Sequence, residues 1–368
     1  MAHASAGSEL CLTALLSLVA ACSHSHGPVD ASTRDDAGPW ETPLPGVDGP
    51  GDFCGLPGRT AAVDLSSDGE EIAVLVRAEL EGQSRVHLVV YRGGRWETRL
   101  SAVDLGAEIR NVRHVESGHL LWPSECGVTR VDGRGRASCL DTWPARATRE
   151  DAAVMRAGPG ELWLLAPGDG RSPFALGGVL VDGSGGAVTD DEGRTHRMSL
   201  EGPAPRTVLG LWGDRTLQYV VTDDAVLASG GGAGILAPRS DVPVTLPLTA
   251  MWMSGRSALF LGTADGQVAI HDGWGGWQVF STGAGPVVSV AAAEGGRIFY
   301  ALEQTVGHVT DGRAEELAEW SSVRPDLHVA AMRPHGEGFV VALASQRERV
   351  GCAAVHVVIY DDGTFRAL

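Results

Sequence analysis

The residues of this 368-residue chain with the most specific chemistry are its six cysteines, which stand at positions Cys11, Cys22, Cys54, Cys126, Cys139 and Cys352. No two have the C-x-x-C spacing of a zinc site, so metal ligation is the second interpretation. The first two lie in an N-terminal segment that we interpret below as an export signal. Because exported chains meet oxidising conditions, we expect the other four to form two disulfide bonds.

Cys126 and Cys139 flank a predicted β-hairpin. The segment between them turns at Asp132-Gly133, a pair that favours a two-residue turn with positive φ at both positions. Counting outward from this turn brings Cys126 directly opposite Cys139, at a pair whose Cα atoms lie about 4.5 Å apart. A disulfide bond fits that distance, although a bulge at Gly135 would shift the register. We therefore predict the bond Cys126–Cys139.

The N-terminus reads as an export signal. Residues 10–21 (LCLTALLSLVAA) are too few to span a bilayer but have the length of a signal-peptide apolar region. The residues that follow, Val19-Ala20-Ala21-Cys22, resemble the lipobox of bacterial lipoproteins, which implies that Cys22 carries lipid and becomes the mature N-terminus. An ordinary cleaved signal and a buried apolar segment are the alternatives. Residues 1–9 depart from the lipoprotein pattern, because they contain no lysine or arginine and carry Glu9.

Three parts of the chain are predicted from this pattern. Residues 1–21 form the lipoprotein signal peptide, and residues 22–53 form a lipidated, proline-rich and disordered tether, because no hydrophobic period runs through them. Residues 54–368 form the folded domain.

Composition excludes several kinds of chemistry. The chain has no lysine, so a Walker-type phosphate loop and Schiff-base chemistry are excluded. Its 29 basic and 46 acidic residues give a net charge of −17, which disfavours nucleic acid as a partner. Neither G-x-S-x-G nor H-E-x-x-H occurs. Six histidines lack a partner spacing and are interpreted as structural: His114, His119, His308, His328, His335 and His356. We expect no catalytic residue, no metal and no cofactor.

The elements that must position these residues are short β-strands. From residue 59 onward, apolar runs alternate with glycine-rich turns, and the clearest turns recur at Gly93-Gly94, Asp132-Gly133, Asp182-Gly183, Gly230-Gly231, Asp272-Gly273, Asp311-Gly312 and Asp362-Gly363. The first strand of each unit is expected near residues 61, 109, 152, 207, 248, 287 and 327. Units of about 40–50 residues are typical of propeller blades. We predict an all-β protein, a β-propeller with seven four-stranded blades, although six or eight would fit nearly as well. Residues 314–320 alone could form a helical turn or two.

Two segments resemble repeats of known propellers. The segment 250–277 resembles a repeat of bacterial lipoprotein propellers at Trp252, Ser254, Gly255, Gly262, Gly266, Val268, His271, Gly273 and Trp277. Residues 66–73 (SSDGEEIA) resemble the Ser-Pro-Asp-Gly turn of periplasmic propeller repeats, with Ser67 in place of the proline. Both resemblances imply structure and carry no catalytic residue. The aromatic residues that recur on strands are expected to pack between blades: Trp96, Trp122, Trp163, Trp212, Trp252, Trp277 and Phe299.

A propeller must also join its first and last blades. Both of these blades have four predicted strands of their own, so we expect no exchanged strand. Cys54 precedes the first strand of the first blade, and Cys352 ends the loop between the second and third strands of the last. Both positions fall on one face of the ring at the seam. We predict the bond Cys54–Cys352, which would stabilise the ring by about 4–5 kcal/mol.

The function expected from these features is binding. An exported propeller, anchored by lipid to the bacterial envelope at the outer membrane, would act as a non-enzymatic scaffold for a protein or a glycan. The alternative is a glycan-active enzyme of the glycosidase or sialidase kind, with carboxylates and arginines in the central channel. Several carboxylates with converging arginines at the axis would favour the enzyme, and a plugged axis would favour the scaffold.

The disulfide predictions are tested by non-reducing peptide mapping of the exported protein. We expect linked peptides for Cys126 with Cys139 and for Cys54 with Cys352. Free thiols at Cys54 and Cys352 in that protein would contradict the covalent closure.

Overall fold

The computed structural model describes residues 47–48, 59–80, 82–102, 109–115, 118–124, 127–139, 153–158, 161–167, 174–181, 187–188, 199–200, 208–213, 217–230, 235–254, 258–272, 276–283, 285–320, 324–345 and 355–368. The chain divides into two units, Met1–Thr42 and Pro43–Leu368. All the strands of the described residues belong to the second unit.

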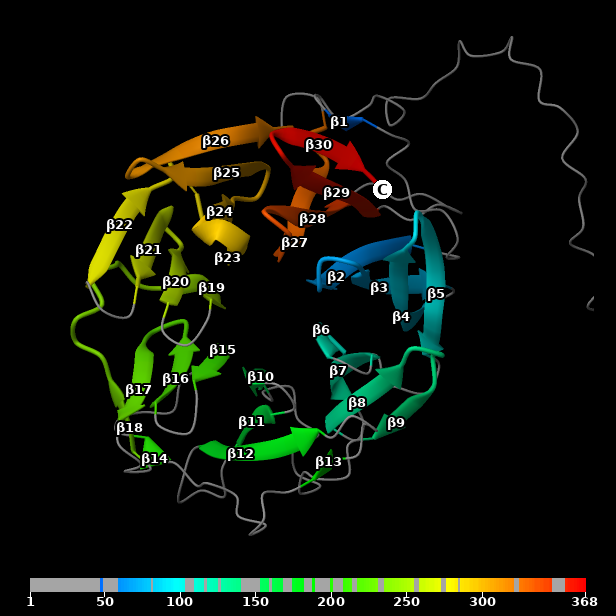
Figure 1. Ribbon diagram of the computed structural model, residues 1–368, viewed down its shortest axis with the longest axis horizontal. Helices are drawn as coiled ribbons and strands as arrows, with labels where there is room; N and C mark the ends of the chain where they lie inside the picture. Colours follow the sequence, from blue (N-terminus) through cyan, green and yellow to red (C-terminus); the bar gives the residue numbers. More distant parts are fainter. Residues whose placement is uncertain are drawn as a thin grey trace, which may run out of the picture. The chain divides into compact units, whose positions relative to one another are not determined.

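These strands form seven sheets around a common axis, and the four main strands of each sheet are antiparallel (Figure 1). The innermost strands are β2 (Arg59–Ser67), β6 (Asn111–Val115), β10 (Ala153–Gly158), β15 (Val208–Gly213), β19 (Leu248–Ser254), β23 (Ser289–Ala292) and β27 (Leu327–His335). The second strands are β3 (Ile72–Leu80), β7 (Gly118–Ser124), β11 (Glu161–Pro167), β16 (Leu217–Thr222), β20 (Ala258–Thr263), β24 (Ile298–Ala301) and β28 (Gly338–Ser345).

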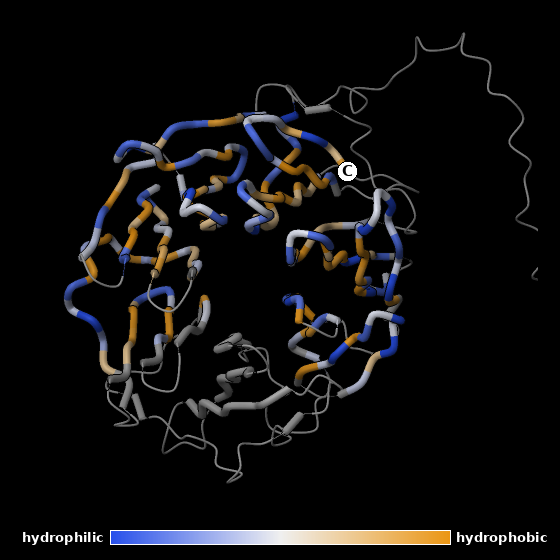
Figure 2. Tube along the Cα trace, viewed as in Figure 1, coloured by the Kyte–Doolittle hydropathy of each residue, from blue (hydrophilic) through white to orange (hydrophobic). Residues whose placement is uncertain are grey.

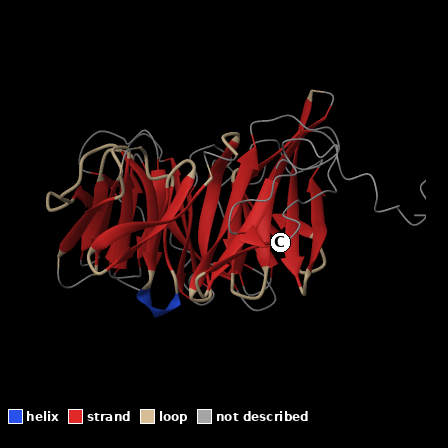
Figure 3. Cartoon of the chain, turned by 90° about the horizontal axis from the view of Figure 1, so that it is seen from above, coloured by secondary structure: helices blue, strands red, loops and turns tan. Residues whose placement is uncertain are grey.

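Two further strands complete each sheet on its outer side. The third strands are β4 (Gln83–Arg92), β8 (Gly127–Asp132), β12 (Phe174–Val181), β17 (Val226–Gly230), β21 (Gln267–His271), β25 (Thr305–Thr310) and β29 (Val355–Asp361). The fourth strands are β5 (Arg95–Ala102), β9 (Ala137–Cys139), β13 (Ala187–Val188), β18 (Ile235–Pro238), β22 (Trp277–Ser281), β26 (Arg313–Glu319) and β30 (Thr364–Ala367). Figure 3 shows the strands running between the two faces of the ring, with the 3₁₀ turn η1 (Glu294–Gly296) at one face.

The prediction of an all-β propeller is confirmed. Each innermost strand begins within about two residues of its predicted start, because the glycine turns that separate the strands are local signals. At Asp311-Gly312 and Asp362-Gly363 all four φ angles are positive, as a tight hairpin turn requires. Six of the seven sheets have side chains that the structure describes, and the sheet β10–β13 is described by its strands alone.

The core consists of apolar layers between neighbouring sheets (Figure 2). In β3, Ile72 and Val74 pack on the last sheet, in a cluster with Val340 and Ile359. Leu75, which follows Val74, points the other way, into a cluster with the second sheet. This alternation follows from the two-residue period of a strand, and it gives every such sheet two buried faces. Neighbouring innermost strands pack pairwise, from β6 through β2, β27, β23, β19 and β15 to β10.

The ring closes in a way that the sequence did not predict. β1 (Val47–Asp48) pairs in parallel with β30, so the last sheet has five strands and its outer edge is covered by a segment from before the first sheet. The expectation that no strand is exchanged was therefore wrong, because a two-residue strand carries too little pattern to be recognised. β14 (Ser199–Leu200) adds a parallel fifth strand to β18 in the same way. Cys54 and Cys352 lie outside the described residues, so their bond stays a prediction.

The predicted register of the hairpin at Asp132-Gly133 was also wrong. Cys139 pairs with Thr129 rather than with position 126, because Gly133 to Arg136 all lie in the loop. Gly135 has φ +77°, and a Cβ there would lie 2.2 Å from the carbonyl oxygen of Arg99. This is the bulge that the sequence left open. Cys126 lies outside the described residues, so the bond Cys126–Cys139 is still a prediction.

Residues 313–319 form the outer strand β26 and not the helical turns that residues 314–320 allowed. The turn at Asp311-Gly312 folds this segment back on β25, and Thr310 pairs directly with Arg313. Strand pairing therefore outweighs the helical preference of its alanine, leucine and glutamate residues.

The packing at the seam can be tested with Leu65, which is fully buried between the first and last sheets. We expect Leu65→Ala to lower the free energy of unfolding by about 2–5 kcal/mol, because it removes apolar contacts and leaves a cavity. The control is Val279→Ala, because the side chain of Val279 is 41% exposed. This substitution should change the free energy of unfolding by less than about 0.5 kcal/mol. Equal urea midpoints for the two variants would contradict the packing described.

Candidate functional site

Four side chains from four different sheets meet at the axis of the ring. They are Asp64 of β2, Arg113 of β6, Trp252 of β19 and Arg333 of β27, and we call them the axial cluster. The guanidinium carbon of Arg113 lies 5.5 Å from the centre of the Trp252 ring, and that of Arg333 lies 5.9 Å from it. The four strands stand on the inner side of the ring in Figure 1. Side chains therefore cross the axis at this level.

Asp64 joins three neighbouring sheets. Its Oδ2 accepts a hydrogen bond from the backbone N–H of Val112 on β6 at 3.0 Å, and its Oδ1 accepts one from Arg333 of β27. The carboxylate is only 7% exposed, so these bonds replace the water that it loses. A β-bulge between Ala62 and Asp64 sets the position of the carboxylate.

The guanidinium group of Arg113 has no hydrogen bond or ion pair with any part of the chain that the structure describes. Its side chain is half-buried and lies against Trp252. Burial and, to a smaller extent, the nearby Arg333 lower the pKa of Arg113 to about 10, although Asp64 opposes the change. Two guanidiniums and one carboxylate give the axial cluster a formal charge of +1 (2 − 1), within a chain whose net charge is −17.

This arrangement suits an anion. A guanidinium offers several N–H donors in a plane that matches a carboxylate, sulfate or phosphate group, and a bound anion would remove the repulsion between the two arginines. The Trp252 ring adds an apolar face beside the cations.

The axial cluster holds one carboxylate where a glycosidase centre needs two. Such enzymes place a pair of carboxyl groups about 5–9.5 Å apart. Asp64 is the one acidic residue in the seven innermost strands, and both of its oxygens are already bonded within the fold.

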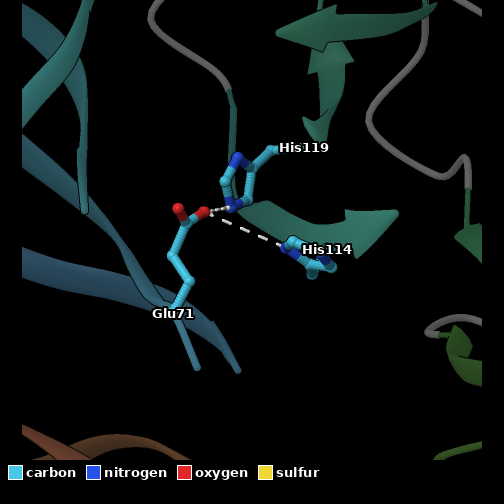
Figure 4. Close-up of side chains that lie close together, drawn as sticks. All are labelled: Glu71, His114 and His119. Carbon is cyan, nitrogen blue, oxygen red and sulfur yellow. Dashed lines mark ion pairs between the residues drawn. The ribbon is translucent and has the colours of Figure 1, made fainter. Parts of the chain in front are cut away.

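A second polar cluster lies beside the first, at the turns that join β2 to β3 and β6 to β7. It consists of Asp68, Glu71, Arg99, His114 and His119, and we call it the Glu71 cluster. Arg99 donates two hydrogen bonds to Glu71, from Nη1 to Oε1 at 2.9 Å and from Nη2 to Oε2 at 2.8 Å. His119 Nε2 lies 3.1 Å from Oε1, and both histidines point toward the carboxylate (Figure 4).

The electrostatics of Glu71 follow from these neighbours. Burial by itself would raise the pKa of Glu71, but the contacts with His119 and Arg99 outweigh it and lower the pKa to about 2. The turn that carries Glu71 is fixed by Asp68, whose Oδ1 accepts hydrogen bonds from the backbone N–H groups of residues 70 and 71. This is the turn that resembles Ser-Pro-Asp-Gly, so the structural role implied by that resemblance agrees with its conformation.

The structure leaves most of the residues singled out from the sequence untested. Cys22, Cys54, Cys126 and Cys352 lie outside the described residues, and Cys139 ends β9. Of the aromatic residues expected between blades, Phe299 is fully buried in such a layer, but Trp252 also faces the axial arginines. The histidines expected to be scattered include one pair, His114 and His119, that the structure brings together.

Only the Glu71 cluster had a signal in the sequence, and that signal was weak. His114 lies directly opposite His119 in the β6–β7 pair, which the spacing of the two histidines could have indicated. Arg113 and Arg333 carry no local signal, because 220 residues separate them and only ring closure brings them to one place.

The comparisons with known proteins identify the fold and nothing finer. The chain matches no protein-family model, and no curated protein matches it. Among solved structures, it is similar to the WD40 β-propeller domain of Doa1, with a TM-score of 0.54, 8% identity, and coverage of 84% of this chain and 97% of that one.

Two other solved structures are similar to the same extent. The extracellular domain of the one-component system BT4673 from B. thetaiotaomicron gives a TM-score of 0.52 at 13% identity over 85% of this chain, which spans 40% of that one. The computationally designed Ika8 protein gives 0.52 at 13% identity, covering 86% and 99%. These likenesses define a β-propeller with WD40-like neighbours. Among the described residues, no helix is long and apolar enough to cross a membrane.

The ion pair at Glu71 should make the free energy of unfolding of the protein depend on pH. Because its pKa falls from 4.5 to about 2 on folding, the stabilisation is present above about pH 4.5 and is lost as the pH falls toward 2. At pH 7 we expect Glu71→Gln to lower the free energy of unfolding by about 3–5 kcal/mol, since it leaves the buried Arg99 unpaired.

The measurement is urea unfolding of both proteins from pH 7 to pH 2, in buffer with EDTA. The control is Glu97→Gln, which breaks an exposed ion pair with Arg95 and should cost no more than about 1 kcal/mol. A difference between wild type and Glu71→Gln that stays constant across this range would show that the carboxylate is not ion-paired.

Proposed function

We propose that this chain is an exported, lipid-anchored β-propeller of the bacterial envelope that acts as a non-enzymatic binding module, and that the axial cluster holds an anionic group of its ligand, a protein or a glycan. The observation that carries the proposal is the half-buried guanidinium of Arg113, which has no hydrogen-bonding or ionic partner among the described residues. A half-buried cation without such a partner loses part of its hydration, and a bound anion would supply the missing partner.

The surroundings of Arg113 support a binding role over catalysis. Each oxygen of Asp64 accepts a hydrogen bond from a neighbouring sheet, so it is a structural group that holds three sheets together rather than a free acid or base. Trp252 and Arg333 reach the same place from other sheets. This combination of a planar cation and an aromatic face recognises a charged group next to an apolar surface, as in an acidic sugar or an acidic peptide side chain.

Three finer features belong to the same proposal. The number of blades is seven, which the seven sheets support. Anchoring occurs through lipid on Cys22, which rests on the lipobox-like residues and the apolar stretch before them. The domain boundaries are those given above, except that residues 47–48 belong to the propeller as β1, so the tether that would hold the propeller away from the membrane ends before Val47.

Binding of defined anions tests the proposed site. Purified chain is titrated calorimetrically with an oligogalacturonate, a sulfated heparin oligosaccharide, a poly-glutamate peptide and neutral dextran. We expect one of the three anionic ligands to bind and dextran not to bind. Arg113→Gln should weaken that binding at least 10-fold, because it removes the unpaired cation.

The matched control is Arg134→Gln, which removes the same charge from an exposed position in the β8–β9 loop. It should leave the affinity within about twofold. Equal weakening by the two variants would mean that the ligand responds to the net charge of the chain and not to the axial cluster. Hydrolysis of either oligosaccharide during the titration would favour the glycan-active enzyme instead.

A further inference from the structure

The Glu71 cluster contains three groups whose atoms converge as metal ligands do. One ligand atom each of Glu71, His114 and His119 can be chosen so that all three lie within 4.8 Å of one another. The Oε1 of Glu71 lies 3.1 Å from His119 Nε2 and 4.0 Å from His114 Nδ1. Around a tetrahedral zinc ion with bonds of about 2.0–2.1 Å, neighbouring ligand atoms stand roughly 3.3–3.5 Å apart. Shifts of about 1 Å or less would therefore bring these atoms to bonding positions.

The histidine pair is presented by its hairpin. His114 and His119 are directly opposite one another on β6 and β7, and their rings meet edge to face with centroids 5.2 Å apart. The hairpin can approach β8 closely because Gly118 has no side chain: a Cβ there would lie 2.1 Å from the carbonyl oxygen of Val131. The two rings thus have fixed places beside Glu71 of the neighbouring sheet.

The surroundings of His119 point to a bound ligand. Its side chain is 0% exposed, and within the described part of the chain neither ring nitrogen makes a hydrogen bond of good geometry. Nε2 is near Oε1 of Glu71 but is not aligned as a donor to it. A buried imidazole without an aligned partner is unfavourable, and a metal ion between Nε2 and the carboxylate would satisfy both groups.

The groups behind the three ligands have the pattern that metal sites use. His114 Nε2 lies 3.0 Å from Asp68 Oδ2, which turns Nδ1 of the same ring toward Glu71. A carboxylate behind a histidine ligand fixes the tautomer and orients the ring. Arg99 donates one hydrogen bond to each oxygen of Glu71, so each oxygen keeps a second lone pair for a further bond.

From this geometry we propose that Glu71 Oε1, His114 Nδ1 and His119 Nε2 bind one divalent transition-metal ion of the zinc class, which links the first and second sheets of the propeller. Two imidazoles and one carboxylate select such an ion over magnesium or calcium, which prefer oxygen ligands. Three protein ligands leave one coordination position open, on the side of His114, the most exposed of the three. The proposal is independent of the anion site at the axis.

Zinc binding tests this site. The full-length chain is stripped with EDTA, dialysed and titrated with Zn²⁺ by calorimetry, in a background that carries His24→Gln and His26→Gln so that the N-terminal histidines do not contribute. We expect one zinc ion per chain. His114→Gln should weaken binding at least 10-fold, and Asp68→Asn should weaken it about 10–100-fold by releasing the ring of His114.

The control is His308→Gln, which removes a histidine that contacts a carboxylate elsewhere, with Nε2 3.5 Å from Glu315 Oε2. It should leave zinc affinity unchanged. Circular dichroism checks the fold of each variant, and Asp68→Asn tests the site even if His114→Gln fails to fold. The visible absorption of bound Co²⁺ should be that of nitrogen and oxygen ligands. Absence of zinc binding, equal loss in His308→Gln, or a thiolate charge-transfer band would overturn the proposal.

Discussion

The structure depends on the mutual burial of sheet faces. A four-stranded antiparallel sheet of this chain is apolar on both faces, as the alternation of Ile72, Val74 and Leu75 between two different clusters shows. No single sheet can bury both faces by itself, so each requires a neighbour on either side. A closed ring is the arrangement that provides this, and the seam between the first and last sheets must be as well packed as any other interface.

The same constraint makes charged side chains at the axis energetically unfavourable. The innermost strands approach one another, so any charged side chain on them loses water. Asp64 accepts hydrogen bonds from Val112 and Arg333, which replace the lost water and join the sheets on both sides of its own. The guanidinium of Arg113 has no hydrogen-bonding or ionic partner among the described residues to replace the water it loses. Such a group in an otherwise consistent fold is typical of a functional site.

The two polar clusters share the first and second sheets but differ in kind. The axial cluster has an excess of cations and an aromatic face, whereas the Glu71 cluster combines a carboxylate with two imidazoles. They are connected through the backbone, because Arg113 and His114 are consecutive on β6, and the backbone N–H of His114 donates a hydrogen bond to Ser66 of β2. Changes in either cluster would therefore affect the spacing of the first and second sheets.

The sequence by itself determined the propeller and the position of nearly every described strand, because glycine turns and two-residue alternation are local properties of the chain. Local patterns were insufficient where a choice depended on distant residues. The register at Asp132 depended on the fit of Gly135 over Arg99, and the closing strand β1 depended on the free edge of β30. The axial cluster was decided by tertiary structure alone: positions 64, 113, 252 and 333 meet only after the ring has closed, so no segment of the chain holds the information that they form one site.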